Sequence, residues 1–151
     1  MASGEKKLLL ASHHEGEAWG LELIPEDNTI LTVGDDNKIF AFDYLNRKLK
    51  AEGEVHAEGK HLKKPKVVAS SLSEYHGNDQ GRAIAYNKHN SHVAVSNNLG
   101  EVTIRTKDSL NTVLKTLKDQ KEWSEVIKYS TCGKYLAVGS HDNFIYIYDV
   151  S

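Results

Sequence analysis

Short runs of apolar residues, most of them alternating with polar ones, recur along the whole chain. Four of these runs are Trp19–Leu23, Lys38–Phe42, Glu101–Ile104 and Phe144–Tyr148, and they are rich in β-branched and aromatic residues. Clusters of Gly, Asn, Asp and Pro separate them and favour turns. Alternation with a period of two places successive side chains on opposite faces of a strand. The pattern therefore predicts an all-β fold of many short antiparallel strands, with helix content close to nil.

The same pattern occurs twice at a fixed distance. Residues 18–43 align without a gap with residues 124–149, which lie 106 positions later. Apolar positions fall on apolar positions and turn residues on turn residues: Leu21 on Ile127, Ile30 on Leu136, Asp36 on Asp142, Ile39 on Ile145 and Asp43 on Asp149. An internal repeat of this kind is typical of an architecture built from similar units.

A third and more divergent copy fits between these two. Its three strands are predicted at 83–86, 92–96 and 101–104, and Val102 stands 43 residues before Ile145. A step of about 43 residues is the length of one four-stranded propeller blade. We therefore expect one domain, 1–151, with about three blades at approximately 13–55, 76–118 and 119–151 and an insertion at 56–80.

These residues resemble the tryptophan-aspartate (WD) repeat family, whose blades are four-stranded antiparallel sheets arranged around a channel. The first copy is the most complete: His14 stands at the family's histidine position, Thr32 at its hydroxyl position and Asp36 at the turn aspartate, and Phe42-Asp43 replaces Trp-Asp. The resemblance implies a buried polar relay from His14 to Asp36. It also implies that Asp142 caps the corresponding turn of the last copy.

A narrower resemblance lies in the last copy. The stretch Tyr135–Tyr148, with Ile127–Ser130 before it and Ala18–Leu21 in the first copy, looks like the echinoderm microtubule-associated protein-like family, and weaker matching covers roughly residues 13 to 149. This resemblance implies a non-catalytic interaction module of a microtubule-associated protein. Its expected partner is tubulin or microtubules, and its expected location is the cytoplasm, at the cytoskeleton. The repeats alone are equally compatible with a generic propeller adaptor that docks peptides of other proteins.

The general binding mode of WD blades places the contact surface at one end of the blades. Residues before and at the start of each inner strand, and the residue before the turn aspartate, line that end. In this chain these residues are Glu17, Trp19, Asp35, Arg82, Trp123, Glu125 and His141. Trp and Arg are enriched at binding hot spots. The other reading is that Trp19 and Trp123 pack between blades.

The insertion at 56–80 is unusually basic. Four of its lysines are close together: Lys60, Lys63, Lys64 and Lys66. A basic loop can attract an acidic surface such as the tails of tubulin, or a phosphate backbone. The alternative is an ordinary solvated loop. With a formal net charge of −2 for the whole chain, nucleic acid is not an expected partner.

Composition limits the chemistry. The chain has 151 residues, of which 39% are apolar and 26% charged, which fits one soluble domain. The longest apolar stretch, Leu8–Ala11, is far too short to span a membrane. Cys132 is the single cysteine, and the histidines and carboxylates alternate across strand faces or lie in turns. We therefore expect no metal, no cofactor and no catalytic site.

The strand count suggests an incomplete ring. About twelve strands are predicted, including an outer strand at Lys7–Ser12, whereas closed propellers have at least four blades. The last blade lacks its outer strand, and the first residues supply an outer strand without a blade. The chain is therefore expected to be a piece of a longer protein or half of an assembly. One form of that assembly is a homodimer that exchanges Lys7–Ser12.

Overall fold

The computed structural model of the chain describes residue 4 and residues 14–55 and 80–151. In that part, three antiparallel sheets follow one another along the chain, and η1 (Pro25–Asp27), a single 3-10 turn, is the sole helical element. The first sheet contains β1 (Ala18–Ile24), β2 (Thr29–Gly34), β3 (Lys38–Asp43) and β4 (Lys48–Glu54). The second contains β5 (Gly81–Asn87), β6 (His92–Asn97), β7 (Val102–Thr106) and β8 (Val113–Leu117). The third contains β9 (Ser124–Tyr129), β10 (Tyr135–Ser140) and β11 (Ile145–Asp149).

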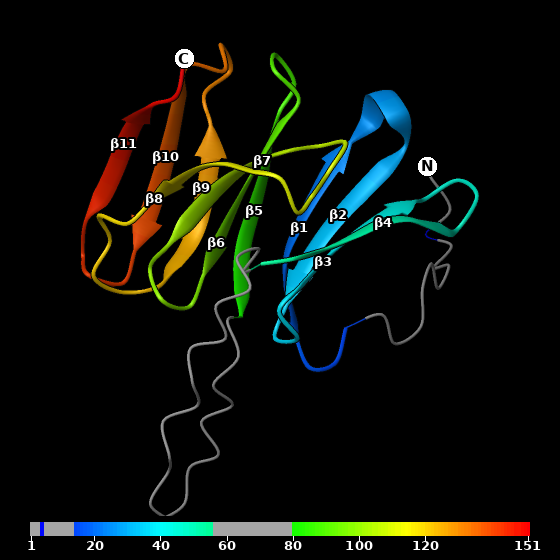
Figure 1. Ribbon diagram of the computed structural model, residues 1–151, viewed down its shortest axis with the longest axis horizontal. Helices are drawn as coiled ribbons and strands as arrows, with labels where there is room; N and C mark the ends of the chain where they lie inside the picture. Colours follow the sequence, from blue (N-terminus) through cyan, green and yellow to red (C-terminus); the bar gives the residue numbers. More distant parts are fainter. Residues whose placement is uncertain (1–3, 5–13, 56–79) are drawn as a thin grey trace, which may run out of the picture.

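The order of strands within each sheet is the order along the chain, as in a propeller blade. Figure 1 shows the three sheets side by side, with the third sheet in red and orange and the first in blue and teal. The prediction of an all-β fold of antiparallel blades is confirmed. The described part of the third sheet has three strands. The predicted outer strand at Lys7–Ser12 lies outside the described residues.

The two outer copies of the repeat pair their strands in the same register. Leu21 faces Thr32 in the first sheet, and their counterparts Ile127 and Val138 face each other in the third. The turn between the second and third strands is also the same. Asn37 and Asn143 both adopt the left-handed conformation there, with φ of 61° and 70°, which Asn tolerates better than most residues. The sequence repeat is therefore a structural repeat.

Two apolar layers hold the sheets together. The layer between the first and second sheets includes Leu31, Val33, Ile39, Ile84 and Val93. The layer between the second and third sheets includes Ala94, Val102, Ile127, Leu136 and Val138. Residues that alternate along a strand enter different layers, as Val93 and Ala94 of β6 do, and most of these side chains are fully buried.

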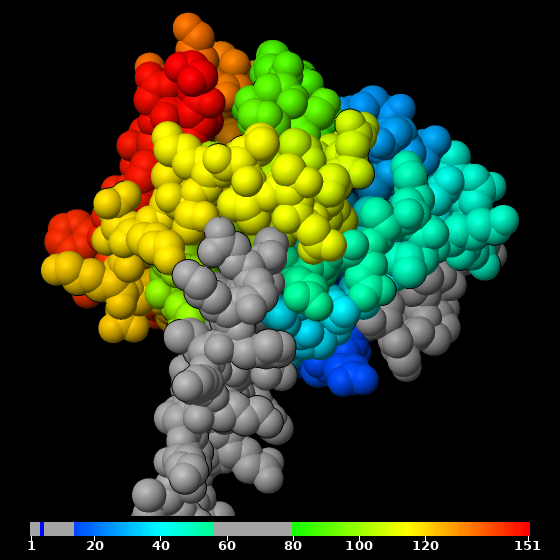
Figure 2. Space-filling model, in the orientation of Figure 1, coloured from blue at the N-terminus to red at the C-terminus, as the bar shows by residue number. Residues whose placement is uncertain are grey.

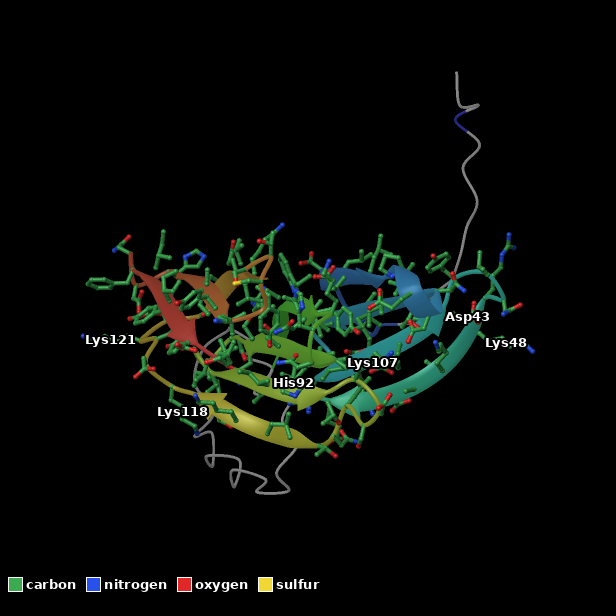
Figure 3. All side chains as sticks on the ribbon, turned by 90° about the horizontal axis from the view of Figure 1, so that it is seen from above. Asp43, Lys48, His92, Lys107, Lys118 and Lys121 are labelled. Carbon is green, nitrogen blue, oxygen red and sulfur yellow. The ribbon has the colours of Figure 1, made fainter. Side chains whose placement is uncertain are left out.

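The first strands of the three sheets, β1, β5 and β9, lie next to one another. Gly20 allows the first of these approaches, because a Cβ at this position would lie 3.2 Å from the backbone of Ala83 and 2.7 Å from Val33. The outer strands lie away from β1, β5 and β9. Figure 2 shows this side of the molecule, where the residues of β8, in yellow, lie between β4 and the third sheet. Seen from above in Figure 3, Asp43 and Lys48 lie near one end of the molecule and Lys121 near the other.

Candidate protein-interaction surface

Three side chains from three sheets stack at one end of the inner strands. Trp19 lies at the start of β1, Arg82 at the start of β5 and Trp123 immediately before β9. The guanidinium carbon of Arg82 lies 4.5 Å from the centroid of each tryptophan ring. A cation at this distance from an indole face is attracted by the ring. This Trp19–Arg82–Trp123 stack therefore connects all three blades on one surface.

Hydrogen bonds to Asp35 fix the Trp19 end of the stack. Nε1 of Trp19 donates to Oδ1 of Asp35 at 2.7 Å, and the backbone N–H of Glu17 donates to Oδ2 of the same carboxylate at 3.1 Å. Asp35 precedes the turn aspartate, as expected for this surface. The carboxylate thus orients the indole and also holds the segment that leads into β1.

At the Trp123 end of the stack, His141 makes an aromatic contact with the indole and pairs with Glu125. The ring of His141 meets that of Trp123 edge-on, with 4.8 Å between centroids. Nε2 of the histidine lies 3.1 Å from Oε1 of Glu125. All seven residues that the sequence assigned to a contact surface therefore lie on or beside the stack.

The centre of the stack carries a positive charge. Nη2 of Arg82 donates to Oε1 of Gln80 at 2.9 Å, while Nε is buried without a hydrogen-bond partner. Among the described residues, no carboxylate forms an ion pair with this guanidinium. A hollow of about 160 Å³ runs beside the stack along β1, β5 and β9. This surface can accept an anionic group at its centre.

The two readings of the tryptophans do not exclude each other. Trp19 is 47% exposed, and Trp123 is half-buried. Each ring packs on Arg82 of the neighbouring blade and still leaves part of its surface free. Gln80, which accepts from the guanidinium, was not expected from the sequence. Its position two residues before Arg82 is the signal that could have indicated it.

The relay behind this surface is built from the first copy's turn. Because a carboxylate only accepts, Nδ1 of His14 donates to Oδ1 of Asp36 at 2.8 Å, and Nε2 lies 3.0 Å from Oγ1 of Thr32. Asp36 also accepts from the backbone N–H groups of Glu15 and Lys38. Burial raises the pKa of Asp36, but these hydrogen bonds outweigh it and hold the pKa below its ordinary value.

The last copy makes the same turn with a different partner. Asp142 accepts from the backbone N–H groups of Lys121 and Phe144 at 2.9 and 3.1 Å. The hydroxyl of Tyr146 donates to it at 2.8 Å and so takes the place of the missing histidine. Tyr146 was not expected from the sequence, and its alignment with Phe40 indicates only an aromatic residue. At the histidine position, Gln120 donates instead to the hydroxyl of Tyr148.

Loss of either turn carboxylate should destabilise the chain. We expect Asp36→Ala to lower the free energy of unfolding by about 1–3 kcal/mol, because His14 and two backbone donors lose their acceptor. Asp142→Ala is expected to destabilise less, since its surroundings are more exposed. Urea unfolding of both variants beside wild type measures the effects. Equal stability of all three proteins would contradict the relay.

The same carboxylates should make stability depend on pH. Desolvation opposes ionisation of Asp142, but the hydrogen bonds from Lys121, Tyr146 and Phe144 prevail and lower its pKa to about 2, from an ordinary value of 3.8. A carboxyl with a lowered folded-state pKa stabilises the fold above its unfolded pKa, and this contribution is lost as the pH falls. We expect stability to decline between pH 5 and pH 2. In urea titrations at several pH values, Asp142→Asn should show a shallower decline than wild type.

The residues that flank the predicted basic loop both bond to the second blade. Lys60, Lys63, Lys64 and Lys66 lie outside the described residues, but the residues that flank the insertion are described. The backbone N–H of Gln80 donates to Oδ1 of Asn98 at 3.0 Å. The carbonyl of Val55 accepts from Nη2 of Arg105. Both flanking positions are thus tied to the second blade, and Gln80 also bonds Arg82 of the stack.

Arg105 is a second residue whose role the sequence did not indicate. It occupies the tryptophan position of the middle copy and is fully buried. Its guanidinium donates to the carbonyls of Glu54, Val55 and Leu110, and its Nε donates to Oγ1 of Thr103. Burial lowers its pKa to about 10, which leaves it charged at neutral pH. Arg105 therefore joins the end of β4 to the second blade.

The potential metal ligands among the described residues do not gather into a site. These residues contain no group of three or more His, Cys, Asp or Glu side chains placed to hold a metal ion. Cys132 is exposed in the turn before β10, and Nε2 of His89 bonds the carbonyl of Thr131. No helix in the described part is long and apolar enough to cross a membrane.

Comparison with known proteins gives the family context. The family model "WD domain, G-beta repeat" matches residues 111–149, which cover β8 to β11. The ciliary WD repeat-containing protein ctxp80 of Euplotoides octocarinatus is 49% identical over 149 residues, or 97% of this chain and 20% of that protein. Echinoderm microtubule-associated protein-like 3 of Homo sapiens is 33% identical over 91% of this chain and 13% of that protein.

A sea-urchin protein extends this set. The 77 kDa echinoderm microtubule-associated protein of Strongylocentrotus purpuratus is 31% identical over 98% of this chain and 18% of that protein. The chain thus spans a fifth or less of the length of these relatives. A chain of the solved structure "Crystal Structure of Mitotic Checkpoint Complex" shares the fold, with a TM-score of 0.72 and 12% identity over 93% of this chain and 38% of that chain. The chain therefore has the propeller-blade fold, matches a WD repeat over residues 111–149, and is similar to echinoderm microtubule-associated protein-like proteins over more than nine-tenths of its length.

Proposed function

We propose that this chain is a non-catalytic protein-interaction module of a microtubule-associated protein, and that its stack surface contacts tubulin at the cytoskeleton in the cytoplasm. The observation that carries the proposal is the Trp19–Arg82–Trp123 stack, which presents aromatic and cationic groups from three blades on one surface. Arg and Trp are the residue types that most often dominate binding energy at protein interfaces.

The charge of the stack favours an acidic partner. The guanidinium of Arg82 lies at the centre, whereas the carboxylate of Asp35 accepts from Trp19 and that of Glu125 pairs with His141. Those two carboxylates are therefore partly occupied within the chain. An acidic side chain of a partner can approach Arg82, and long-range attraction by the lysines of the 56–80 insertion would speed the encounter. Tubulin, with its acidic tails, has this chemistry.

The relatives support the same partner. Two of them carry "microtubule-associated protein" in their names, and a third is described as ciliary.

Co-sedimentation with microtubules tests the proposal. The full-length protein that contains this chain is expected to pellet with polymerised tubulin in a saturable manner and to remain in the supernatant without it. Binding should weaken as salt is raised, because the contact with an acidic surface is electrostatic. A protein that stays in the supernatant and instead captures peptides of another complex would favour a general propeller adaptor and contradict the assignment to tubulin.

A further inference from the structure

We propose that a pocket between the second and third blades, at the opposite end of the inner strands from the stack, binds acidic side chains of a partner peptide. The pocket has a volume of about 300 Å³, and its walls are the ends of β5 and β9 and the turns that follow these strands. Figure 1 shows the two turns, in green and orange, next to each other at one end of the molecule. The site is separate from the stack and does not rest on the proposed function.

The walls of the pocket belong to blades that pack on each other within this chain. Ala85 of β5 and Ile127 of β9 share the buried cluster between the second and third sheets. Glu22 of β1 adds a side chain from the first blade to the lining. The pocket therefore lies among three successive blades, and its walls do not depend on what covers the outer faces of the first and third sheets.

Hydrogen bonds between the two turns fix the shape of the pocket. The buried side chain of Asn87 donates from Nδ2 to the carbonyl of Gly133 at 2.8 Å. Because a carbonyl only accepts, Nε2 of His89 donates to the carbonyl of Thr131, at 2.9 Å. Gly133 has a φ of 73°, and a Cβ at this position would lie 2.7 Å from Oδ1 of Asn87, so glycine permits the approach. The pocket is thus formed before a ligand arrives, which reduces the entropy cost of binding.

Two lysines give the pocket its charge. Lys88 of the β5–β6 turn and Lys128 of β9 line it from different blades, and both side chains are exposed. In the part of the chain that the structure describes, neither ammonium group has an ion-pair partner. The carboxylate of Glu22 accepts instead from the backbone N–H groups of Leu23 and Tyr86, at 3.0 and 3.3 Å. The lining therefore keeps a net positive charge.

A buried hydroxyl at the wall of the pocket lacks an acceptor. Tyr129 lines the pocket, and its hydroxyl has no hydrogen-bond partner among the described residues. Burial raises the pKa of Tyr129, so the hydroxyl keeps its proton at neutral pH. A buried donor without an acceptor is costly, and an oxygen of a ligand in the pocket would supply the acceptor. The pocket thus offers two cations and one neutral donor to the same ligand.

This set of groups favours several carboxylates on one peptide over a single phosphate group. Phosphate sites commonly gather free backbone N–H groups, but those of Tyr86 and His89 already donate to Glu22 and to Asn87. The lysines reach the pocket from two blades, so a chain that carries more than one carboxylate can pair with both. A volume of about 300 Å³ admits side chains of an extended segment rather than a folded element.

Fluorescence anisotropy with a labelled hexaglutamate peptide tests the proposal. The measurements use the full-length protein that contains this chain, with Arg82→Gln in every sample so that the stack has lost its charge. The peptide is expected to bind this protein saturably, whereas a Gly-Ser peptide of the same length is not. Lys88→Gln combined with Lys128→Gln should weaken binding at least about 10-fold, because two charged donors are lost.

Two further variants separate the pocket from general attraction between charges. Lys48→Gln combined with Lys115→Gln removes the same charge from exposed positions of the outer strands β4 and β8, and should bind the peptide as strongly as the Arg82→Gln protein. Tyr129→Phe removes only the hydroxyl and should weaken binding about 3-fold or more. Its melting temperature should not fall, because the hydroxyl has no partner in the free protein.

Three results would overturn the proposal. The first is an Arg82→Gln protein that does not bind hexaglutamate. The second is an equal loss of binding in the outer-strand control and in the variant that lacks Lys88 and Lys128. The third is unchanged binding in that lysine variant and in Tyr129→Phe. Because Arg82→Gln is present throughout, a failure of the stack to bind microtubules would not affect any of these readouts.

Discussion

Arg105→Ala is expected to reduce the stability of the chain by about 3 kcal/mol or more, because three backbone carbonyls lose their donor and a large buried side chain is removed. The Arg105 guanidinium donates to carbonyls of both blades, those of Glu54 and Val55 beside the first sheet and that of Leu110 in the second blade. No smaller side chain reaches all three of them. Equilibrium unfolding in urea measures the loss.

Two further variants define what Arg105 contributes. Arg105→Lys keeps the charge but has a single nitrogen at its tip, so it should recover only part of the stability. Lys128→Ala, an exposed position on β9, should leave the free energy of unfolding within about 0.5 kcal/mol of wild type. If the urea midpoint of Arg105→Ala equalled that of wild type, the blades would be joined without this residue.

The second large effect is expected on binding. Arg82→Gln removes the charge at the centre of the stack and leaves a shorter, neutral polar side chain, and Trp123→Ala removes one of its two aromatic faces. Each substitution should weaken binding of the acidic partner at least about 10-fold, as for a hot-spot residue. Because the rings are partly exposed, melting temperatures should change little. A large drop in melting temperature for Trp123→Ala would instead indicate that its main contribution is to packing between blades.

Much of the fold could be predicted because the repeat constrains it. The gapless match of 18–43 with 124–149 sets the strands, the turns and even the register, since one face of each strand must meet an apolar layer. The turn residues also repeat. Asp36 and Asp142 each accept a hydrogen bond from the backbone N–H two residues later, and Asn37 and Asn143 both adopt the left-handed conformation. Local propensity and tertiary packing agree at these positions.

The residues that the sequence did not reveal are those that depart from the repeat. Arg105 stands where the family has tryptophan, and nothing in the sequence tells which carbonyls a buried guanidinium will meet. Tyr146 supplies a hydroxyl where the first copy uses His14, a substitution that depends on three-dimensional proximity. The sequence predicted the residues of the proposed contact surface, because each occupies a known position in its repeat. It did not predict that Trp19 and Trp123 stack on Arg82, because that contact depends on the distance between neighbouring blades.

The most direct test of the central claim is the dissociation constant of the full-length protein for microtubules, measured by co-sedimentation for wild type, Arg82→Gln and Leu45→Ala. Leu45 is exposed in the turn between β3 and β4, at the opposite end of the blade from the stack, and serves as the matched control. We expect binding by Arg82→Gln to be at least about 10-fold weaker and binding by Leu45→Ala to equal that of wild type. Wild-type binding that is unchanged by Arg82→Gln would contradict the assignment of the stack as the contact surface.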